Sequence, residues 1–284
     1  MLGAIIGDIV GSVYEWNNIK TKDFLLLRDD CFFTDDTVMT IATADAIMNG
    51  ATEDSFIDAY KKWGRLYPDA GYGGRFSDWL HSDEREPYNS WGNGSAMRVS
   101  PCGWLMDCGF TARTGLWPSN GRKAARLSAA VTHNHPEGIK GALAVTDAIF
   151  LCRFYFGGYK MDDGSENCSH PDAWKARIKK HIEQEYGYNL SQTLNEIRPA
   201  YRFNESCQDT VPQAIIAFLE SNGFEDAIRN AISLGGDSDT LAAITGSIAE
   251  AAYGVPTWIK DQALSYLDEP LREVYKRWMA YLEG

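Results

Sequence analysis

Two short acidic segments, far apart in the chain, carry the residue types that could do chemistry. Thr34-Asp35-Asp36-Thr37 and Asp237-Ser238-Asp239-Thr240 each precede apolar residues at helical spacing, so each is expected at the start of a helix. An N-cap would explain either segment alone, because acids in a first helical turn stabilise the helix dipole by about 0.3–1 kcal/mol each. A cap uses only one side-chain oxygen, however, so each segment keeps at least one spare carboxylate.

The spare carboxylates predict a metal centre if the two helix starts meet. Four carboxylates converging without a counter-charge would be strongly unfavourable, and cations remove that difficulty. Oxygen ligands with no His or Cys nearby in sequence select hard cations such as Mg, Mn or Ca over Zn or Cu. Two divalent ions would balance the four carboxylates charge for charge.

The same segments resemble a family signature. TDDT at 34–37, GNGSAMR at 92–98 and GGDSDTLAAITG at 235–246 are similar, in that order, to the motifs of the ADP-ribosylglycohydrolase family. GDIVGSVYE at 7–15 and TVPQAIIAFLESNGFEDAI at 210–228 extend the resemblance. It implies an all-α, single-domain orthogonal helical bundle with two Mg or Mn ions at one end of the central helices. The metal ligands that it implies are Thr34, Asp35, Asp36, Asp237, Asp239 and Thr240.

The resemblance also implies an activity. The expected protein is a metal-dependent hydrolase that cleaves the glycosidic bond between ADP-ribose and a modified side chain or small acceptor. Arginine-linked ADP-ribose is the first expectation, with serine-linked and O-acetyl conjugates as alternatives, and the partner is an ADP-ribosylated protein or small conjugate. Two other functions stay open: an ADP-ribose-binding module without turnover, and a binuclear-metal phosphohydrolase.

Glu15 and Asp36 are the predicted catalytic residues. Glu15 lies seven residues after Asp8, which predicts the same face of one helix, where a solvated charge would be the ordinary interpretation. The resemblance instead implies an acid that approaches the metals and the scissile ribose. Either Asp36 or Glu15 would take the proton of the attacking water, and Asp8 is expected to be a structural hydrogen-bonding residue.

Two glycine-rich loops and one histidine are the predicted substrate-binding residues. Such loops form turns by default, but they also let backbone N–H groups approach a pyrophosphate. His133 of a Thr-His pair is preferred over His135 as the contact to ribose or adenine. Arg98 is expected in a structural ion pair, and His81, His170 and His181 are given no role. The predicted substrate contacts are Gly71, Gly73, Gly92, Asn93, Gly94, Ser95 and His133.

These residues must be positioned by helices, because apolar residues recur at spacings of three and four while alternating strand patterns are nearly absent. Irregular connections are expected at 67–120 and 159–170. Gly3, Gly7 and Gly11 predict a close approach to a similarly small surface at Ala242 and Gly246. The predicted helices span 1–16, 35–49, 53–66, 121–131, 137–158, 171–186, 210–221, 224–233, 238–253 and 271–282, within one domain of residues 1–284.

Composition limits the partners. The 284 residues carry 27 basic and 39 acidic side chains, a formal net charge of −12, which argues against nucleic acid. Six cysteines without a CxxC pair indicate reduced thiols in a cytoplasmic protein. The apolar N-terminus has no basic region and contains Asp8 and Glu15, so no signal peptide or membrane span is predicted. A monomer is expected.

Overall fold

The computed structural model describes residues 1–157 and 171–284, and within these residues it is entirely helical. No β-strand occurs in the described chain, where the single extended pairing is an isolated bridge between Gly92 and Ser206. The predicted all-α class is therefore confirmed. His170, Cys168 and the expected loop at 159–170 lie outside the described residues.

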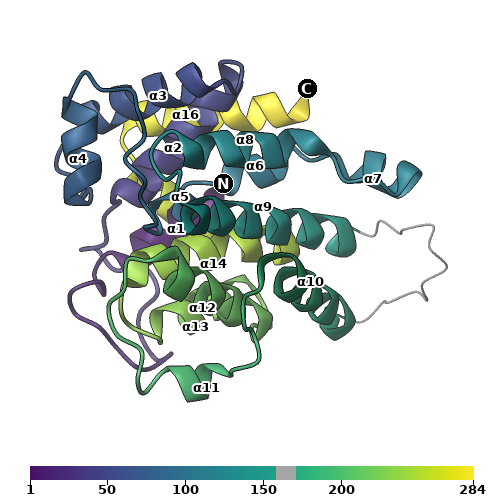
Figure 1. The fold of residues 1–284 in the computed structure, drawn as a ribbon. Helices are drawn as coiled ribbons and strands as arrows, with labels where there is room; N and C mark the ends of the chain where they lie inside the picture. The colour runs from purple at the N-terminus through teal and green to yellow at the C-terminus, as the bar shows by residue number, and fades with distance from the viewer. Residues whose placement is uncertain (158–170) are drawn as a thin grey trace.

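The middle of the molecule is formed by helices from the start, the middle and the later part of the sequence (Figure 1). They are α1 (Leu2–Gly11), α9 (Pro136–Phe156) and α14 (Ser238–Tyr253). In the view of Figure 1, one group of helices lies above them: α2 (Asp35–Met48), α3 (Glu53–Leu66), α4 (Gly74–His81), α5 (Gly94–Met97), α6 (Ser100–Trp104), α7 (Cys108–Thr114), α8 (Ser119–Ala130) and α16 (Glu269–Glu283). Those below are α10 (Pro171–Tyr186), α11 (Leu194–Ile197), α12 (Cys207–Leu219) and α13 (Phe224–Ile232). The remaining helix, α15 (Thr257–Tyr266), contacts α1.

The glycine stripe of α1 lies directly against the backbone of α14. A Cβ added to Gly7 would lie 2.0 Å from the carbonyl oxygen of Ala242, and one added to Gly3 would lie 2.1 Å from that of Gly246. Any side chain on this face would therefore push the two helices apart. The predicted close approach is confirmed, and it brings the end of α1 to the start of α14, where Gly11 meets Asp239.

The first helix ends at Gly11, so the prediction of a helix over 1–16 was five residues too long. The Ser12 hydroxyl donates to the carbonyl of Ile9 and accepts the N–H of Phe32, which ties the turn to the segment before α2. The Asn18 side-chain amide donates to the carbonyls of Tyr14 and Glu15. These contacts turn the chain across the start of α14 instead of continuing along the helix axis.

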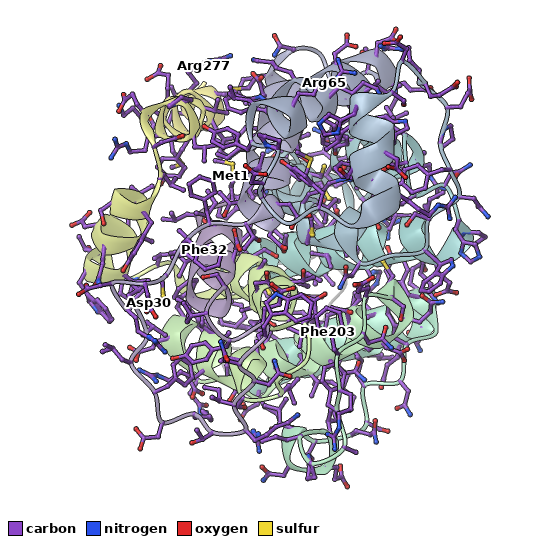
Figure 2. The ribbon with its side chains drawn as sticks, turned by 90° about the vertical axis from the view of Figure 1, so that its left-hand side faces the viewer. Met1, Asp30, Phe32, Arg65, Phe203 and Arg277 are labelled. Atoms are coloured by element: carbon purple, nitrogen blue, oxygen red, sulfur yellow. The ribbon has the colours of Figure 1, made fainter. Side chains whose placement is uncertain are left out.

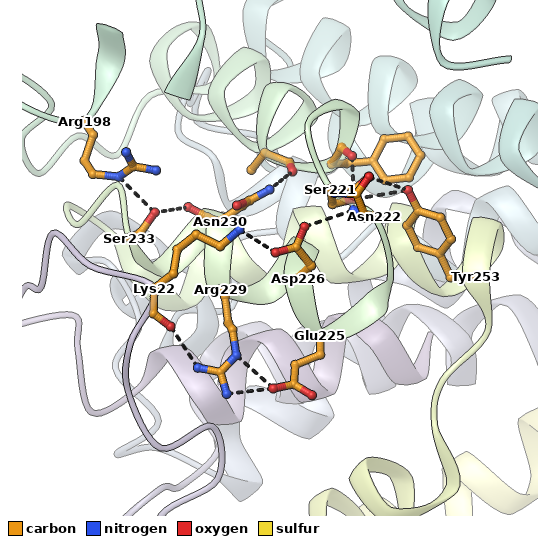
Figure 3. Close-up of polar contacts among 12 residues, drawn as sticks. Lys22, Arg198, Ser221, Asn222, Glu225, Asp226, Arg229, Asn230, Ser233 and Tyr253 are labelled. Atoms are coloured by element: carbon orange, nitrogen blue, oxygen red, sulfur yellow. Dashed lines mark hydrogen bonds and ion pairs between the residues drawn. The ribbon is translucent and has the colours of Figure 1, made fainter. Parts of the chain in front are cut away.

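Polar contacts fix α13 to the segment that follows this turn (Figure 3). Lys22 pairs with Asp226, and Arg229 donates to the carbonyls of Lys22 and Phe24 at 2.9 and 2.6 Å. Arg229 also donates to Glu225, one helical turn earlier, at 2.8 Å. The segment between α1 and α2 is thereby held against α13.

A buried carboxylate joins α8, α9 and α10. Asp147 accepts hydrogen bonds from Arg122, from Tyr186 and from Nε2 of His181, the last at 3.0 Å. The His181 ring stacks on Trp117 with 4.7 Å between centroids. His181 was given no chemical role from sequence, and its place in this network is structural.

Six helices were not predicted: α4, α5, α6, α7, α11 and α15. Five of them have eight residues or fewer, which is too short to show a clear apolar period. Ser206 caps α12 by accepting the N–H of Asp209, so that helix begins three residues before the predicted start at 210. Among the described residues no helix is both long and apolar enough to cross a membrane. The five described cysteines are all free.

Candidate metal centre

The two acidic segments meet at one end of the central helices. Asp8, Asp36 and Asp239 bring carboxylate oxygens within 4.8 Å of one another, and Glu15, Asp237 and Asp239 do the same. Asp239 belongs to both groups, so the two clusters share a carboxylate. The four aspartates are buried, while Glu15 is half-buried.

Asp8 organises the start of α2. Its oxygens accept the Thr34 N–H at 2.9 Å, the Thr34 hydroxyl at 2.6 Å and the Thr37 N–H at 3.0 Å. The Thr34 hydroxyl in turn accepts the N–H of Asp36 at 3.4 Å, as expected of an N-cap. Asp8 is thus the structural hydrogen-bonding residue that was expected, and it is also one of the clustered acids.

Asp36 is held from the opposite helix. The Thr240 hydroxyl donates to Asp36 Oδ2 at 3.0 Å, and the Thr240 N–H donates to Asp239 at 3.0 Å. Asp36 Oδ1 is buried and has no hydrogen-bond partner among the described residues. A buried carboxylate oxygen without a donor is costly unless a cation satisfies it.

Two consecutive glycines aim Asp237 and Asp239 inward. Gly235 and Gly236 have φ values of +67° and +76°, a region that favours glycine, and a Cβ on Gly236 would lie 2.8 Å from the ring of Tyr201. The Asn93 amide then donates to Asp237 at 2.7 Å.

Glu15 reaches this cluster from the turn after α1, not from a helix face. The prediction of a shared face with Asp8 was therefore wrong, although Glu15 does join the acids. Asn18 explains its position, because the Asn18 side chain also bonds both the N–H and the carbonyl of Gly236. One amide therefore ties the Glu15 turn to the glycine turn.

Burial and mutual repulsion raise the pKa values of these acids. Burial first, and then the charges of Asp237 and Asp8, raise the pKa of Glu15 to about 7. Burial raises the pKa of Asp8 to about 6 against the opposing hydrogen bonds from Thr34 and Thr37. The pKa values of Asp36 and Asp239 are also well above their usual range, through burial and neighbouring carboxylates.

The donor set fits divalent cations. Ligand oxygens at about 2.0–2.1 Å from Mg, or about 2.3–2.6 Å from Ca, lie no more than roughly 4–5 Å from one another. Both groups meet that limit, and cations would neutralise the repulsion and satisfy Asp36 Oδ1.

Asp35, also predicted as a ligand, belongs to neither group of clustered acids. Its N–H donates to the carbonyl of Ala70 at 2.8 Å, and a Cβ on Gly71 would lie 3.7 Å from Asp35 Oδ1. The pKa of Asp35 lies well above its usual range because of burial and then Asp8. Gly71 thus borders the acids, whereas Gly73 is exposed and precedes α4.

The second glycine loop lies beside His133. A Cβ on Gly92 or Gly94 would lie 3.6 or 3.1 Å from His133 Nε2, and Nδ1 of the same ring lies 2.8 Å from the Thr132 hydroxyl. Burial, followed by the charge of Arg98, holds the pKa of His133 well below its usual range, so the ring is neutral.

Three other predicted residues near this loop have structural contacts. The Ser95 hydroxyl donates to the carbonyl of Gly138 at 2.7 Å, away from the acids. His135 caps α9 by accepting the N–H of Glu137. Arg98 was expected in an ion pair, but its described partners are neutral: it donates to Ser128 and Thr132 and lies 4.2 Å from the Tyr60 ring centroid.

Asn18 and Thr210 are the site residues that sequence reasoning missed. Thr210 accepts from the Asn93 amide at 3.2 Å, and Asn18 bonds the glycine turn 218 residues away. Thr210 is the first residue of the segment 210–228, which was part of the family resemblance in the sequence. Asn18 has no local signal except its place in a polar turn after an apolar helix.

Comparisons with known proteins agree with this site. A family model described as ADP-ribosylglycohydrolase matches residues 1–282. ADP-ribosylhydrolase ARH3 of Homo sapiens is 27% identical over 320 residues, covering 90% of this chain and 84% of that protein. ADP-ribosylarginine hydrolase Tri1 of Pseudomonas putida is 25% identical over 309 residues, covering 98% of this chain and 77% of that protein.

A solved structure shares the fold. It is an ADP-ribosylglycohydrolase-related protein complex that superposes with a TM-score of 0.60 at 21% identity, over 93% of this chain and 95% of its own. The family model spans nearly the whole chain and its acidic motifs converge in one cluster. This protein therefore belongs to the ADP-ribosylglycohydrolase family.

Proposed function

We propose that this protein is a metal-dependent hydrolase that cleaves the glycosidic bond between ADP-ribose and an acceptor, releasing free ADP-ribose. The observation that carries the proposal is the convergence of five acids in two groups that share Asp239, with one oxygen of Asp36 buried and without a hydrogen-bond partner among the described residues. Family membership supports ADP-ribose conjugates as the substrate class.

The proposed ligands are Thr34, Asp35, Asp36, Asp237, Asp239 and Thr240, together with the carboxylate of Asp8 that lies among them. When bound, two Mg or Mn ions would supply charge stabilisation and orient the ribose and the attacking water. The protein's part is to keep the site rigid. Thr34 and Thr240 do this, because each contacts carboxylates from two helices. The Thr34 hydroxyl lies within reach of Asp8 and Asp239, and Thr240 donates its hydroxyl to Asp36 and its N–H to Asp239.

The proton of the attacking water goes to a carboxylate, and the candidates are Glu15 and Asp36. Glu15 is half-buried and borders solvent, so it can pass the proton on. Asp36 is buried more deeply and offers only its unpartnered oxygen. We assign the proton to Glu15 and the ligand role to Asp36.

Substrate contacts are proposed for the two glycine loops and His133. The neutral His133 ring directs Nε2 to the Gly92 and Gly94 loop, where it could meet a ribose or adenine polar atom. Asn93 is fixed by Asp237 and Thr210, which places its loop next to the acids. We propose arginine-linked ADP-ribose as the substrate, and the Tri1 relative named for that linkage supports this choice.

The proposal is tested by incubating the protein with ADP-ribosylarginine, an ADP-ribosylserine peptide and O-acetyl-ADP-ribose, with Mg or Mn and with EDTA. Free ADP-ribose is followed by chromatography. We expect metal-dependent release, fastest from the arginine conjugate. Asp36→Asn should abolish turnover with the helical circular dichroism unchanged, while Asp261→Asn, at an exposed acid of α15, should behave as wild type.

Three outcomes would contradict the proposal. Full release in EDTA would remove the metal from the mechanism. Phosphate or AMP as the product would instead indicate a phosphohydrolase, and tight ADP-ribose binding without release from any conjugate would indicate a binding module.

A further inference from the structure

An exposed pair of aromatic rings stands next to the acid cluster. Trp16 directly follows Glu15 and is 77% exposed, which is unusual for a tryptophan, and it stacks on Phe203. The ring centroids are 5.3 Å apart and the planes differ by 20°.

The pair is held in place from both sides. Asn18 bonds the carbonyls of Tyr14 and Glu15, which fixes the backbone just before Trp16. Lys20 donates to the carbonyl of Tyr201 at 2.9 Å, which fixes the segment that carries Phe203. Phe203 covers one face of the indole, and the large exposure of Trp16 leaves its other face to solvent.

Trp16 also lines a cavity of about 520 Å³. Tyr14, Phe32, Arg28 and Asp30 are among its other lining residues. Figure 2 shows Phe32, Asp30 and Phe203 on one face of the molecule. The N–H of Phe32 donates to Ser12, at the end of α1, so the cavity borders the turn that leads to Glu15.

The cavity wall already contains one guanidinium group, that of Arg28. Arg28 donates to both oxygens of Asp30, at 2.8 and 2.6 Å, and its Cζ lies 5.8 Å from the Tyr14 ring centroid. A planar, weakly hydrated cation that stacks on aromatic rings and pairs with carboxylates therefore suits this surface.

Two carboxylates lie beside the open face of Trp16. Glu15 directly precedes it, and the exposed Glu205 lies close enough for its charge to act on Glu15. The described contacts of the nearby basic side chains are with backbone carbonyls: Arg202 donates to Pro199 and Tyr201, and Lys20 to Tyr201 and Leu234. A cation stacked on Trp16 would therefore lie beside carboxylates that these basic side chains do not pair with.

We propose that Trp16, supported by Phe203, is the platform on which the acceptor half of the substrate stacks, and that this half is an arginine side chain. The inference rests on the proposed hydrolase function and adds the residues that select the acceptor. A serine acceptor has only a short neutral hydroxyl and an O-acetyl group has no cation, so neither gains from the platform. Trp16 acts in specificity and not in the chemical step.

The test compares Trp16→Ala with wild type on ADP-ribosylarginine and on the ADP-ribosylserine peptide. A cation stacked on an aromatic ring contributes about 0.5–2 kcal/mol, or roughly 2- to 30-fold in affinity. We expect KM for the arginine conjugate to rise about tenfold, with kcat and the serine-peptide KM changed less than twofold. Trp16→Phe should restore most of the affinity. Trp258→Ala, at another exposed tryptophan on α15, is the matched control and should change nothing.

Binding measurements separate this inference from the proposed function. If wild type releases no ADP-ribose, the function proposal fails, and calorimetric titration with ADP-ribosylarginine and with ADP-ribose still tests the platform. Trp16→Ala should then weaken the first ligand about tenfold and leave the second unchanged. Equal affinities in wild type and variant, equal KM changes for both conjugates, or a fall in kcat alone would overturn the inference.

Discussion

Without metal, this protein should become less stable as the pH rises from 5 to 8, because its clustered acids resist ionisation. The pKa of Asp8 rises from an ordinary 3.8 to about 6, and that of Glu15 from 4.5 to about 7. A carboxylate whose pKa is raised by folding keeps its proton in the native state at pH values where the unfolded chain has lost it. Its contribution to stability is complete below the unfolded pKa and is lost as the pH rises through the folded pKa.

The size of this loss in folding stability follows from the part of each pKa shift that lies above pH 5. One pH unit corresponds to about 1.4 kcal/mol per proton, so Asp8 loses about 1.4 kcal/mol between pH 5 and 6. Glu15 would lose about twice that between pH 5 and 7, which we halve because its side chain is partly exposed to solvent. The expected total is about 3 kcal/mol, equivalent to a fall in Tm of roughly 6–12 °C for a chain of this size.

The assay is thermal unfolding by circular dichroism at pH 5, 6, 7 and 8, in EDTA and in excess Mn. Mn competes with protons for the same oxygens, so the difference in Tm between the two conditions should grow with pH. Asp36→Asn in EDTA is the control: it removes one charge from the cluster, so its Tm should be higher at pH 8 and should depend less on pH. Chelated wild type that is equally stable, or more stable, at pH 8 than at pH 5 would refute the reasoning.

Two further changes test the packing. Gly7→Ala would place a Cβ 2.0 Å from the Ala242 carbonyl and should lower the free energy of unfolding by about 2–3 kcal/mol despite the better helix propensity of alanine. Gly223→Ala, with open space around it, is the control in chemical denaturation, and equal stability of the two variants would disprove the close contact. Asp147→Ala should cost about 3 kcal/mol, because it leaves the partly buried Arg122 without its carboxylate. An unchanged denaturation midpoint for Asp147→Ala would show that this network does not anchor α10.

The sequence was sufficient to predict the parts of the site that depend on residues close together in the chain. Each acidic segment combines a cap, two carboxylates and an apolar helix, and the glycine stripe has a spacing of four. These patterns predicted α2 and α14, the contact between α1 and α14, and the meeting of Asp36 with Asp239. The helical class followed from the same periodicity.

The parts that were missed depend on contacts between distant segments. The end of α1 is set by Ser12 and Asn18 through partners near Phe32 and Gly236, and nothing within residues 1–16 shows that a helix must stop there. Glu15 consequently reached the acids by a different path from the one expected. His181 looked isolated in sequence because its partner, Asp147, is 34 residues away on another helix.

The backbone contact between α1 and α14 also constrains how the chain can be made. All ten residues of α1 are buried, yet the helix that covers its glycine face begins more than 200 residues later. At a synthesis rate of about 5–20 residues per second, roughly 10–50 s pass between the emergence of the two helices from the ribosome. Throughout that interval the apolar α1 lacks its packing partner, and one of the three acids of the first cluster and two of the three of the second have not been synthesised. The complete acidic site is therefore a property of the finished chain, and α1 is an apolar segment exposed to aggregation until α14 has been made.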